Sequence, residues 1–140
     1  MLVDANLLLY ARNTDDPRHA PARAWLEAVL NGPTRVGLPW PSLTAFVRIA
    51  THRRVFAQPL SSEAAANQVL DWLDAPAAWV PSPTERHGEI FTHLVREHDA
   101  TGALVTDAHL AALAVEHGIE VASTDTDFDR FDVRWFDPLA

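Results

Sequence analysis

Three aspartates far apart in the chain share one local setting, the end of an apolar segment. Asp4 follows Met-Leu-Val, Asp107 follows Ala-Leu-Val-Thr, and Asp125 follows Ile-Glu-Val-Ala-Ser-Thr. In an α/β protein, side chains just past the carboxyl ends of parallel strands meet in one crevice. Carboxylates gathered there repel each other unless a divalent cation lies between them. The pattern therefore predicts a hard-metal site, and such a site is best suited to hydrolysis of a phosphodiester bond.

Each aspartate also has a simpler explanation when it is taken alone. Asp4 directly precedes a helical segment, where an aspartate commonly caps the helix. Asp107 falls in the first turn of an expected helix, where a carboxylate gains only ~0.3–1 kcal/mol from the helix dipole. Asp125, Asp127 and Asp129 fall within five residues. That density favours cation binding, although acid-rich turns are also common at protein surfaces.

Other catalytic templates do not fit the sequence. The loop that begins at Asp125 lacks the glycine and the final glutamate of an EF-hand. The five glycines form neither a dinucleotide-binding nor a P-loop motif, and no nucleophile elbow is present. The seven histidines lack the H-E-x-x-H spacing of a zinc site, so we interpret them as surface or interface residues. These exclusions leave the aspartates as the strongest candidates.

Alternating short strands and helices are expected to position these residues. Strands are predicted at 1–4, 36–39, 79–80, 119–123 and 133–136, and helices at 5–12, 19–30, 42–52, 62–73, 82–99 and 107–117. Residues 104–105 are either extended or a loop. The fifth helix is predicted to begin at Ser82-Pro83-Thr84-Glu85, which has the pattern of a capping box. This alternation indicates a parallel sheet with helices on both faces, in a single domain spanning 1–140.

Composition restricts the class of protein. The chain of 140 residues is 48% hydrophobic, with no run of 18 apolar residues and no signal-peptide pattern, so we expect no membrane span. The absence of cysteine excludes disulfides and fits a cytoplasmic protein. A net charge of −8 argues against nucleic-acid binding by general electrostatic attraction.

The basic residues are nevertheless unevenly distributed. All 11 are arginines, and the stretch between Glu27 and Glu63 contains no acid. Arg48, Arg53 and Arg54 lie in this stretch, and arginine is suited to bidentate contact with phosphate or carboxylate. They are therefore candidates for binding RNA or an acidic partner segment. A basic helix face in solvent explains them equally well.

Three segments of the chain resemble a known family. Leu-Val-Asp-Ala-Asn-Leu-Leu at 2–8, Gly-Ala-Leu-Val-Thr-Asp-Ala-His-Leu-Ala-Ala-Leu-Ala at 102–114 and Ser-Thr-Asp-Thr-Asp-Phe at 123–128 resemble the PIN domain. More narrowly, they resemble VapC-type toxins of bacterial toxin–antitoxin pairs. The stretch at 46–56 and the ending Arg-Trp-Phe-Asp-Pro-Leu are similar to one branch of those toxins. The motifs occur in the family's order and span essentially the whole chain.

The resemblance implies a fold, an activity and a set of site residues. The implied fold is a three-layer α/β/α sandwich with a five-stranded parallel sheet. The implied activity is that of a ribonuclease dependent on Mg²⁺ or Mn²⁺, usually a homodimer, which a cognate VapB-like antitoxin inhibits. By position, Asp4, Asp107 and Asp125 would be metal ligands, with Asp127 a further ligand or a water-holding residue. Asn6 and Thr124 would support them.

The chain departs from the family pattern at one place. PIN nucleases commonly carry a glutamate on the helix after the second strand, and here that place falls on Phe46 or a neighbour. A second metal ion is therefore doubtful. The leading hypothesis is an Mg²⁺-dependent endoribonuclease that cleaves structured or single-stranded RNA, in which Asp127 accepts the proton of the attacking water. The alternative is a weak or inactive module that binds RNA or an antitoxin. A phosphoryl-transfer domain is a third option, but Asn6 interrupts the expected D-x-D pattern and the chain has no lysine.

Overall fold

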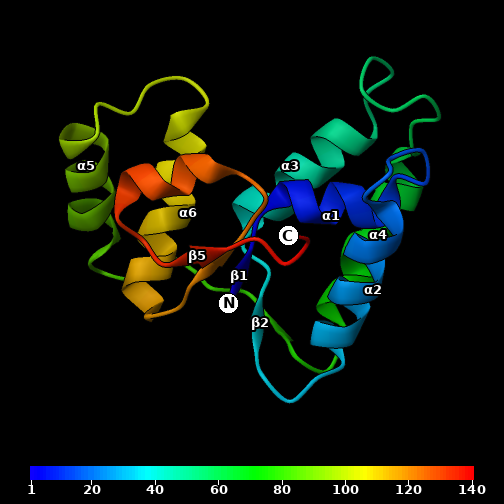
Figure 1. Ribbon diagram of the computed structural model, residues 1–140, viewed down its shortest axis with the longest axis horizontal. Helices are drawn as coiled ribbons and strands as arrows, with labels where there is room; N and C mark the ends of the chain where they lie inside the picture. The colour runs from blue at the N-terminus through cyan, green and yellow to red at the C-terminus, as the bar shows by residue number, and fades with distance from the viewer.

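A five-stranded parallel sheet forms the centre of the protein in a computed structural model that describes residues 1–140 (Figure 1). The strand order is β3-β2-β1-β4-β5, and every neighbouring pair is parallel. The strands are β1 (Leu2–Val3), β2 (Val36–Gly37), β3 (Ala78–Trp79), β4 (Val121–Ala122) and β5 (Trp135–Phe136). The predicted five-stranded parallel sheet is therefore confirmed.

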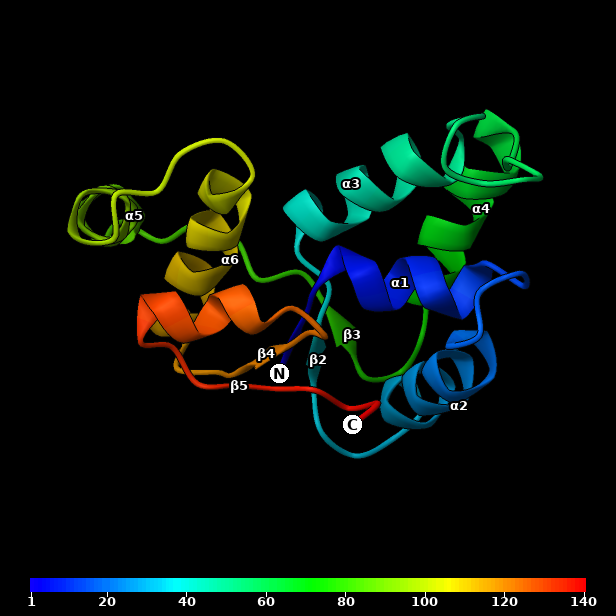
Figure 2. The same cartoon turned by 45° about the horizontal axis from the view of Figure 1, so that its top comes forward.

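Helices cover both faces of this sheet. They are α1 (Ala5–Arg12), α2 (His19–Leu30), α3 (Trp40–Ala50), α4 (Ser62–Leu73), α5 (His87–Glu97), α6 (Leu104–His117) and the 3₁₀ helix η1 (Thr126–Phe131). Figures 1 and 2 show α1 to α4 on one side and α5, α6 and η1 on the other. No helix is both long enough and apolar enough to cross a membrane.

Two separate hydrophobic clusters show how the strands bury both faces. Val3 and Val36 pack into the cluster formed with α1 to α4. Leu2 and Val121 pack into the cluster formed with α6 and with Phe128 of η1. Because successive side chains of a strand point to opposite faces, this division gives three layers, as in the predicted α/β/α sandwich.

The carboxyl ends of β1 and β4 bring the first candidate residues together. Asp4 N donates a hydrogen bond to Ala122 O at 3.0 Å, and Ser123 N donates to Phe136 O at 3.1 Å. Asp4 is also the N-cap of α1, since its Oδ1 accepts a hydrogen bond from Ala5 N at 2.7 Å. The capping explanation for Asp4 is therefore correct, and it is compatible with a role in a site.

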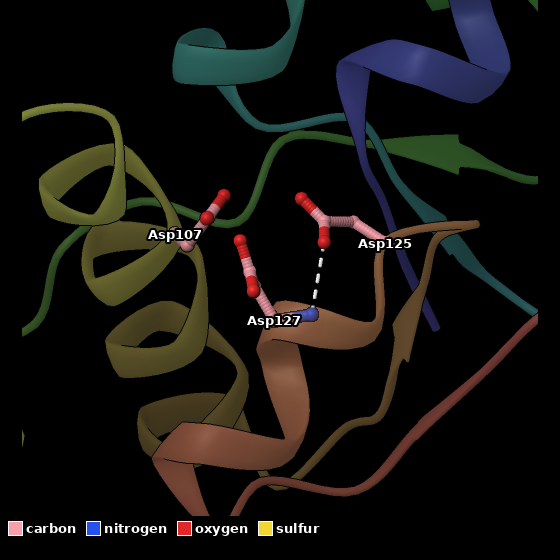
Figure 3. A group of neighbouring side chains, drawn as sticks. All are labelled: Asp107, Asp125 and Asp127. Carbon is pink, nitrogen blue, oxygen red and sulfur yellow. Dashed lines mark hydrogen bonds between the residues drawn. The ribbon is translucent and has the colours of Figure 1, made fainter.

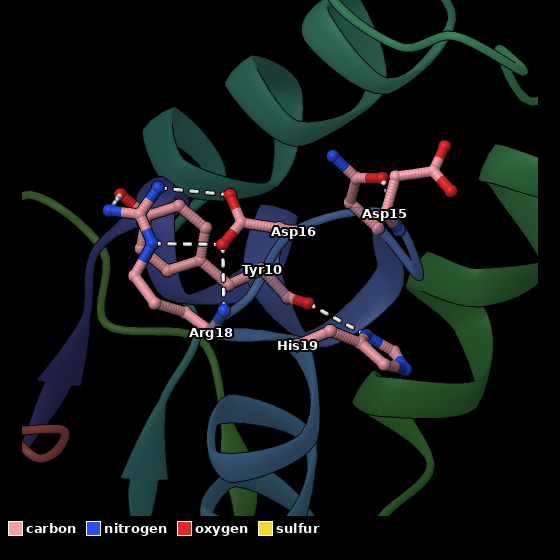
Figure 4. A network of polar contacts seen from close by, with 6 residues as sticks. Tyr10, Asp15, Asp16, Arg18 and His19 are labelled. Carbon is pink, nitrogen blue, oxygen red and sulfur yellow. Dashed lines mark hydrogen bonds and ion pairs between the residues drawn. The ribbon is translucent and has the colours of Figure 1, made fainter.

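A polar network fixes the connection between α1 and α2 (Figure 4). The Arg18 guanidinium donates two hydrogen bonds of 2.9 Å to the carboxylate of Asp16 and lies 3.8 Å from the centre of the Tyr10 ring. His19 Nδ1 lies 2.9 Å from the carbonyl oxygen of Tyr10. The hydrogen bonds from Arg18 lower the pKa of Asp16 below its usual value. These contacts hold the C-terminal end of α1 against α2.

The predicted capping box at 82–85 is wrong, because α5 begins at His87. Thr84 instead binds the carboxylate of Glu116 on α6, with its backbone N at 2.8 Å and its Oγ1 at 2.7 Å from Glu116 Oε1. His87 Nδ1 hydrogen-bonds the other oxygen, Oε2. The Thr84 hydroxyl also accepts a hydrogen bond of 3.2 Å from Arg86 N. The segment before α5 is therefore held against α6, and the helix begins later than predicted.

Two other helix starts differ from the prediction. α3 begins at Trp40 with Pro39 as its N-cap, whereas Ser42 lies inside the helix and is buried. α6 begins at Leu104, so the undecided pair 104–105 is helical. Gly118 ends α6 in the left-handed conformation with φ of 64°, as expected for a glycine at that place.

Candidate metal centre

Asp107, Asp125 and Asp127 converge in space although they come from different elements (Figure 3). Asp107 lies in the first part of α6, Asp125 is the N-cap of η1, and Asp127 lies within η1. One carboxylate oxygen from each lies within 4.8 Å of the other two. Asp125 Oδ1 also accepts a hydrogen bond of 2.8 Å from Asp127 N, which fixes its direction. We call these three residues the carboxylate cluster.

Asp4 lies beside the carboxylate cluster and is more buried, with 9% of its surface exposed. Ser123 connects it to the cluster, because its hydroxyl donates to Asp4 Oδ2 at 2.7 Å and accepts from Asp125 N at 2.9 Å. The same hydroxyl accepts from Asn6 Nδ2 at 3.1 Å. A serine hydroxyl has one hydrogen to donate and two lone pairs, so Ser123 makes every hydrogen bond available to it.

Ser123 is the residue that the predicted set lacks. The predicted supporting residues are Asn6, which reaches Asp4 only through Ser123, and Thr124, whose side chain makes no hydrogen bond. The signal in the sequence is the pair Ser123-Thr124 at the end of a strand. Because successive strand residues point to opposite sides, one hydroxyl faces Asp4, and the sequence does not show which one.

The cluster is electrostatically unfavourable for charged carboxylates alone. Burial raises the pKa of Asp107 to about 7, and the negative charges of Asp4, Asp125 and Asp127 add to the effect. Burial also raises the pKa of Asp4, although hydrogen bonds from Ser123 and Ala5 partly offset it. A bound cation would remove this cost by pairing with the ionised carboxylates.

The donor set fits a divalent cation that prefers oxygen ligands. Mg²⁺ binds oxygen at about 2.0–2.1 Å, so two ligands on opposite sides of the ion lie about 4 Å apart. The carboxylate oxygens lie within 4.8 Å of one another, which is comparable to that spacing. Arg130 Nε lies 3.6 Å from Asp127 Oδ1, but both side chains are exposed, so this contact does not neutralise the cluster.

α3 contributes no carboxylate to this site. Phe46, near the usual place of the family's glutamate, is completely buried and makes an edge-to-face contact with Trp72, with ring centres 4.7 Å apart. It therefore belongs to the core between α3 and α4. The residues that could hold a metal are limited to the carboxylate cluster and Asp4.

The predicted RNA-binding arginines lie at the C-terminal end of α3 and in the turn that follows it. Arg48 is exposed and lines a cavity together with Thr106, the residue before Asp107. Arg53 and Arg54 are exposed in the turn that follows the C-terminal end of α3. Arg48 is the one of the three that lines this cavity with Thr106, and Arg53 and Arg54 do not line it.

Comparison with known proteins gives the family. The model of the PIN domain matches residues 1–134. Ribonuclease VapC37 from Mycobacterium tuberculosis (strain ATCC 25618 / H37Rv) is 52% identical over 141 residues, which cover 99% of this chain and 97% of that protein. Ribonuclease VapC33 from Mycobacterium tuberculosis (strain CDC 1551 / Oshkosh) is 43% identical over 140 residues, covering 99% of this chain and 98% of its own.

Solved structures agree on the fold. The crystal structure of Mycobacterium tuberculosis VapC20, described as a sarcin–ricin loop cleaving toxin, has a TM-score of 0.71 at 20% identity and covers 94% of this chain and 95% of its own. VapBC2 from Rickettsia felis, bound to a DNA fragment from its promoter, has a TM-score of 0.68 at 13% identity and covers 96% of both chains. The full-length sequence matches and the shared fold lead to one conclusion: this chain belongs to the PIN-domain family, and within it to the VapC ribonucleases.

Proposed function

We propose that the protein is an Mg²⁺-dependent endoribonuclease that acts as the toxin of a toxin–antitoxin pair, with Mn²⁺ as a possible substitute ion. The observation that carries this proposal is the convergence of Asp107, Asp125 and Asp127, with Asp4 beside them. A hard divalent cation prefers oxygen ligands, which these carboxylates supply. A bound cation would also relieve the mutual repulsion between them. The substrate is structured or single-stranded cellular RNA in the cytoplasm.

The chain's own residues divide the work at this site. Asp107 and Asp125 would hold the ion, Asp4 would complete or support the ligand set, and Ser123 orients Asp4 and the Asp125 backbone. When bound, the divalent cation supplies a Lewis acid at the scissile phosphate and lowers the pKa of a water molecule. The side chain of Asp127 is 44% exposed, so one of its oxygens is accessible to accept the proton of the attacking water.

We further propose a VapB-like antitoxin as the partner and a homodimer as the assembly. Solved structures with this fold include the complexes VapBC2 and VapBC-1 from nontypeable Haemophilus influenzae. An apolar groove between α3 and α4 offers a surface for a protein partner, and exposed Leu70 lies on its rim. A short reading frame next to the gene, with a basic DNA-binding N-terminus, is the expected source of the antitoxin.

The second candidate function is a catalytically weak or inactive module that binds RNA or an antitoxin. It is favoured by one observation, the absence of any carboxylate on α3. Undetectable cleavage with both Mg²⁺ and Mn²⁺, together with measurable affinity for RNA or for the antitoxin, would establish it in place of the nuclease.

Cleavage of structured RNA and of single-stranded RNA, with Mg²⁺ and with EDTA, tests the leading proposal. We expect cleavage with Mg²⁺ that EDTA and Asp4→Asn abolish. Asp129→Asn is the matched control, because Asp129 lies in η1 but accepts a hydrogen bond from Trp135 Nε1 at 2.6 Å and lies outside the carboxylate cluster. Activity that survives both the chelator and Asp4→Asn would rule out the metal mechanism.

A further inference from the structure

Two adjoining cavities form a trench between α3 and α6. They share Pro41, Thr44 and His109 as lining residues, and their volumes are about 490 and 450 Å³. The first cavity is also lined by Arg48 and by Thr106, which directly precedes Asp107 of the carboxylate cluster. The trench therefore begins beside the candidate metal site.

The second cavity extends the trench away from the carboxylate cluster. It reaches Trp40, at the start of α3, and the segment 81–83 that follows β3. Trp40, Thr44 and Arg48 are spaced four residues apart on α3, so they lie along one side of the helix over about 12 Å. They mark a path that leads from the cluster to an aromatic ring.

The lining of the trench is free of acidic residues. The whole chain contains 19 acids and has a net charge of −8, yet neither cavity is lined by an aspartate or a glutamate. The polar groups in the lining are hydroxyls, the imidazole of His109 and the guanidinium of Arg48. This region is therefore compatible with a phosphate backbone, whereas much of the remaining surface would repel it.

Trp40 is an exposed aromatic side chain on a rigid part of the backbone. Its surface is 52% exposed, although tryptophan is usually well covered in folded proteins. Pro39 and Pro41 flank it, and its carbonyl oxygen accepts a hydrogen bond of 2.8 Å from Thr44 Oγ1. Bases of single-stranded nucleic acids stack on such rings without strong sequence preference, since every base has a π-face.

We propose that the trench is the path of the single-stranded part of the RNA substrate and that one unpaired base stacks on Trp40. Arg48 contacts the RNA backbone between that base and the scissile phosphate at the carboxylate cluster. This inference rests on the proposed ribonuclease function and names the specificity-determining contact of the same site. A stacking platform would favour unpaired RNA, because a base within a duplex does not present its face to Trp40.

The affinity of a non-cleaving protein for a short unstructured oligoribonucleotide tests this proposal. Asp125→Asn serves as the background, with Mg²⁺ present, and fluorescence anisotropy gives the Kd. We expect Trp40→Ala to raise the Kd by about 10- to 100-fold and Trp40→Phe to restore most of the affinity. In a series of oligonucleotides that each lack the base at a different position, loss of one particular base should weaken binding to the Asp125→Asn protein. Loss of the same base should not weaken binding further when Trp40→Ala is added.

Leu70→Ala is the matched control, because Trp40 also lines the apolar groove between α3 and α4, whereas Leu70 lines that groove and not the trench. We expect Leu70→Ala to leave the RNA affinity unchanged. A Kd for Trp40→Ala within twofold of the background, with antitoxin binding lost instead, would overturn the proposal and assign Trp40 to a protein interface. Trp40-dependent RNA affinity without Mg²⁺-dependent cleavage by the wild-type protein would overturn the nuclease function and leave the stacking site standing.

Discussion

At the scale of single residues, Ser123 determines how the carboxylates are arranged. Its hydroxyl makes three hydrogen bonds, which join the end of β1 to the end of β4 and to the start of η1. The residue is completely buried. Without this hydroxyl, the buried Asp4 Oδ2 and the backbone N–H of Asp125 would lose these partners. Ser123 therefore affects both the stability of the fold and the geometry of the site.

We predict that Ser123→Ala lowers the free energy of unfolding by about 1–3 kcal/mol, the usual cost of leaving buried polar groups unpaired. It should also weaken Mn²⁺ binding by about 10- to 100-fold, as expected for the loss of a residue that orients a ligand. Denaturant unfolding and calorimetric titration measure the two effects. Thr124→Ala, which removes no hydrogen bond, is the comparison. Equal effects of the two substitutions would show that Ser123 has no special role.

The raised pKa of Asp107 predicts an unusual pH dependence of stability without metal. The folded protein holds the Asp107 proton more tightly than the unfolded chain, in which the pKa is near its ordinary value of 3.8. This group therefore favours the folded state fully at low pH, and the contribution is lost as the pH rises toward about 7. With EDTA present, we expect the pH-dependent loss of thermal stability between about pH 4 and about pH 7 to be smaller in Asp107→Asn than in wild type.

Divalent cations should compete with the same proton. Because a metal ligand must be ionised, Mg²⁺ affinity should fall as the pH drops below about 7, where Asp107 becomes protonated. Calorimetric titration of the wild-type protein at several pH values measures this. An affinity that does not change over this range would show that Asp107 is not a ligand.

At the scale of elements, the strands were easier to predict than the beginnings of helices. All five strands follow from short apolar runs between turn residues, and Asp4 and Asp125 lie just past β1 and β4 as expected. The expectation is wrong for Asp107, which follows no strand and reaches the carboxylate cluster from α6. The helix predicted to begin at Ser82 begins at His87, and Glu116 of α6 binds Thr84 in the segment before it. A local sequence pattern does not contain a contact of that kind.

The position on α3 where the family commonly carries a glutamate is occupied by a core residue. Phe46 fills the core against Trp72, so its position is not available to a charged group. We predict that Phe46→Glu lowers the free energy of unfolding by more than about 3 kcal/mol, because it removes a buried ring and buries a charge. Ala45 lines the trench instead, and Ala45→Glu should fold normally. Thermal unfolding compares the two, and a stable Phe46→Glu protein would contradict this assignment.

At the scale of the whole molecule, negative charge and substrate binding are in tension. The chain carries a net charge of −8, and its crevice gathers further negative charge at one point. A divalent cation would reduce the local repulsion, and the lining between α3 and α6, which contains no acid, would allow the proposed RNA path without further repulsion. The net charge argues only against nucleic-acid binding by general electrostatic attraction, since it does not show where the charges lie in the fold.

Divalent cations should also stabilise the whole fold. A ligand that binds only the folded state adds about 2.7 kcal/mol to the free energy of unfolding at one hundred times its Kd. Mg²⁺ should therefore raise the thermal midpoint of the wild-type protein and of Asp129→Asn, but not that of Asp125→Asn. A similar rise in all three proteins would indicate that the ion binds elsewhere.

The most direct test of the central claim is the rate of RNA cleavage as Mg²⁺ is titrated into wild type, Asp125→Asn and Asp129→Asn. If the carboxylate cluster holds the catalytic ion, the rate will rise with Mg²⁺ and saturate for wild type and Asp129→Asn, and it will stay at background for Asp125→Asn. Equal saturation curves for Asp125→Asn and wild type, or cleavage that persists without divalent cations, would contradict the claim.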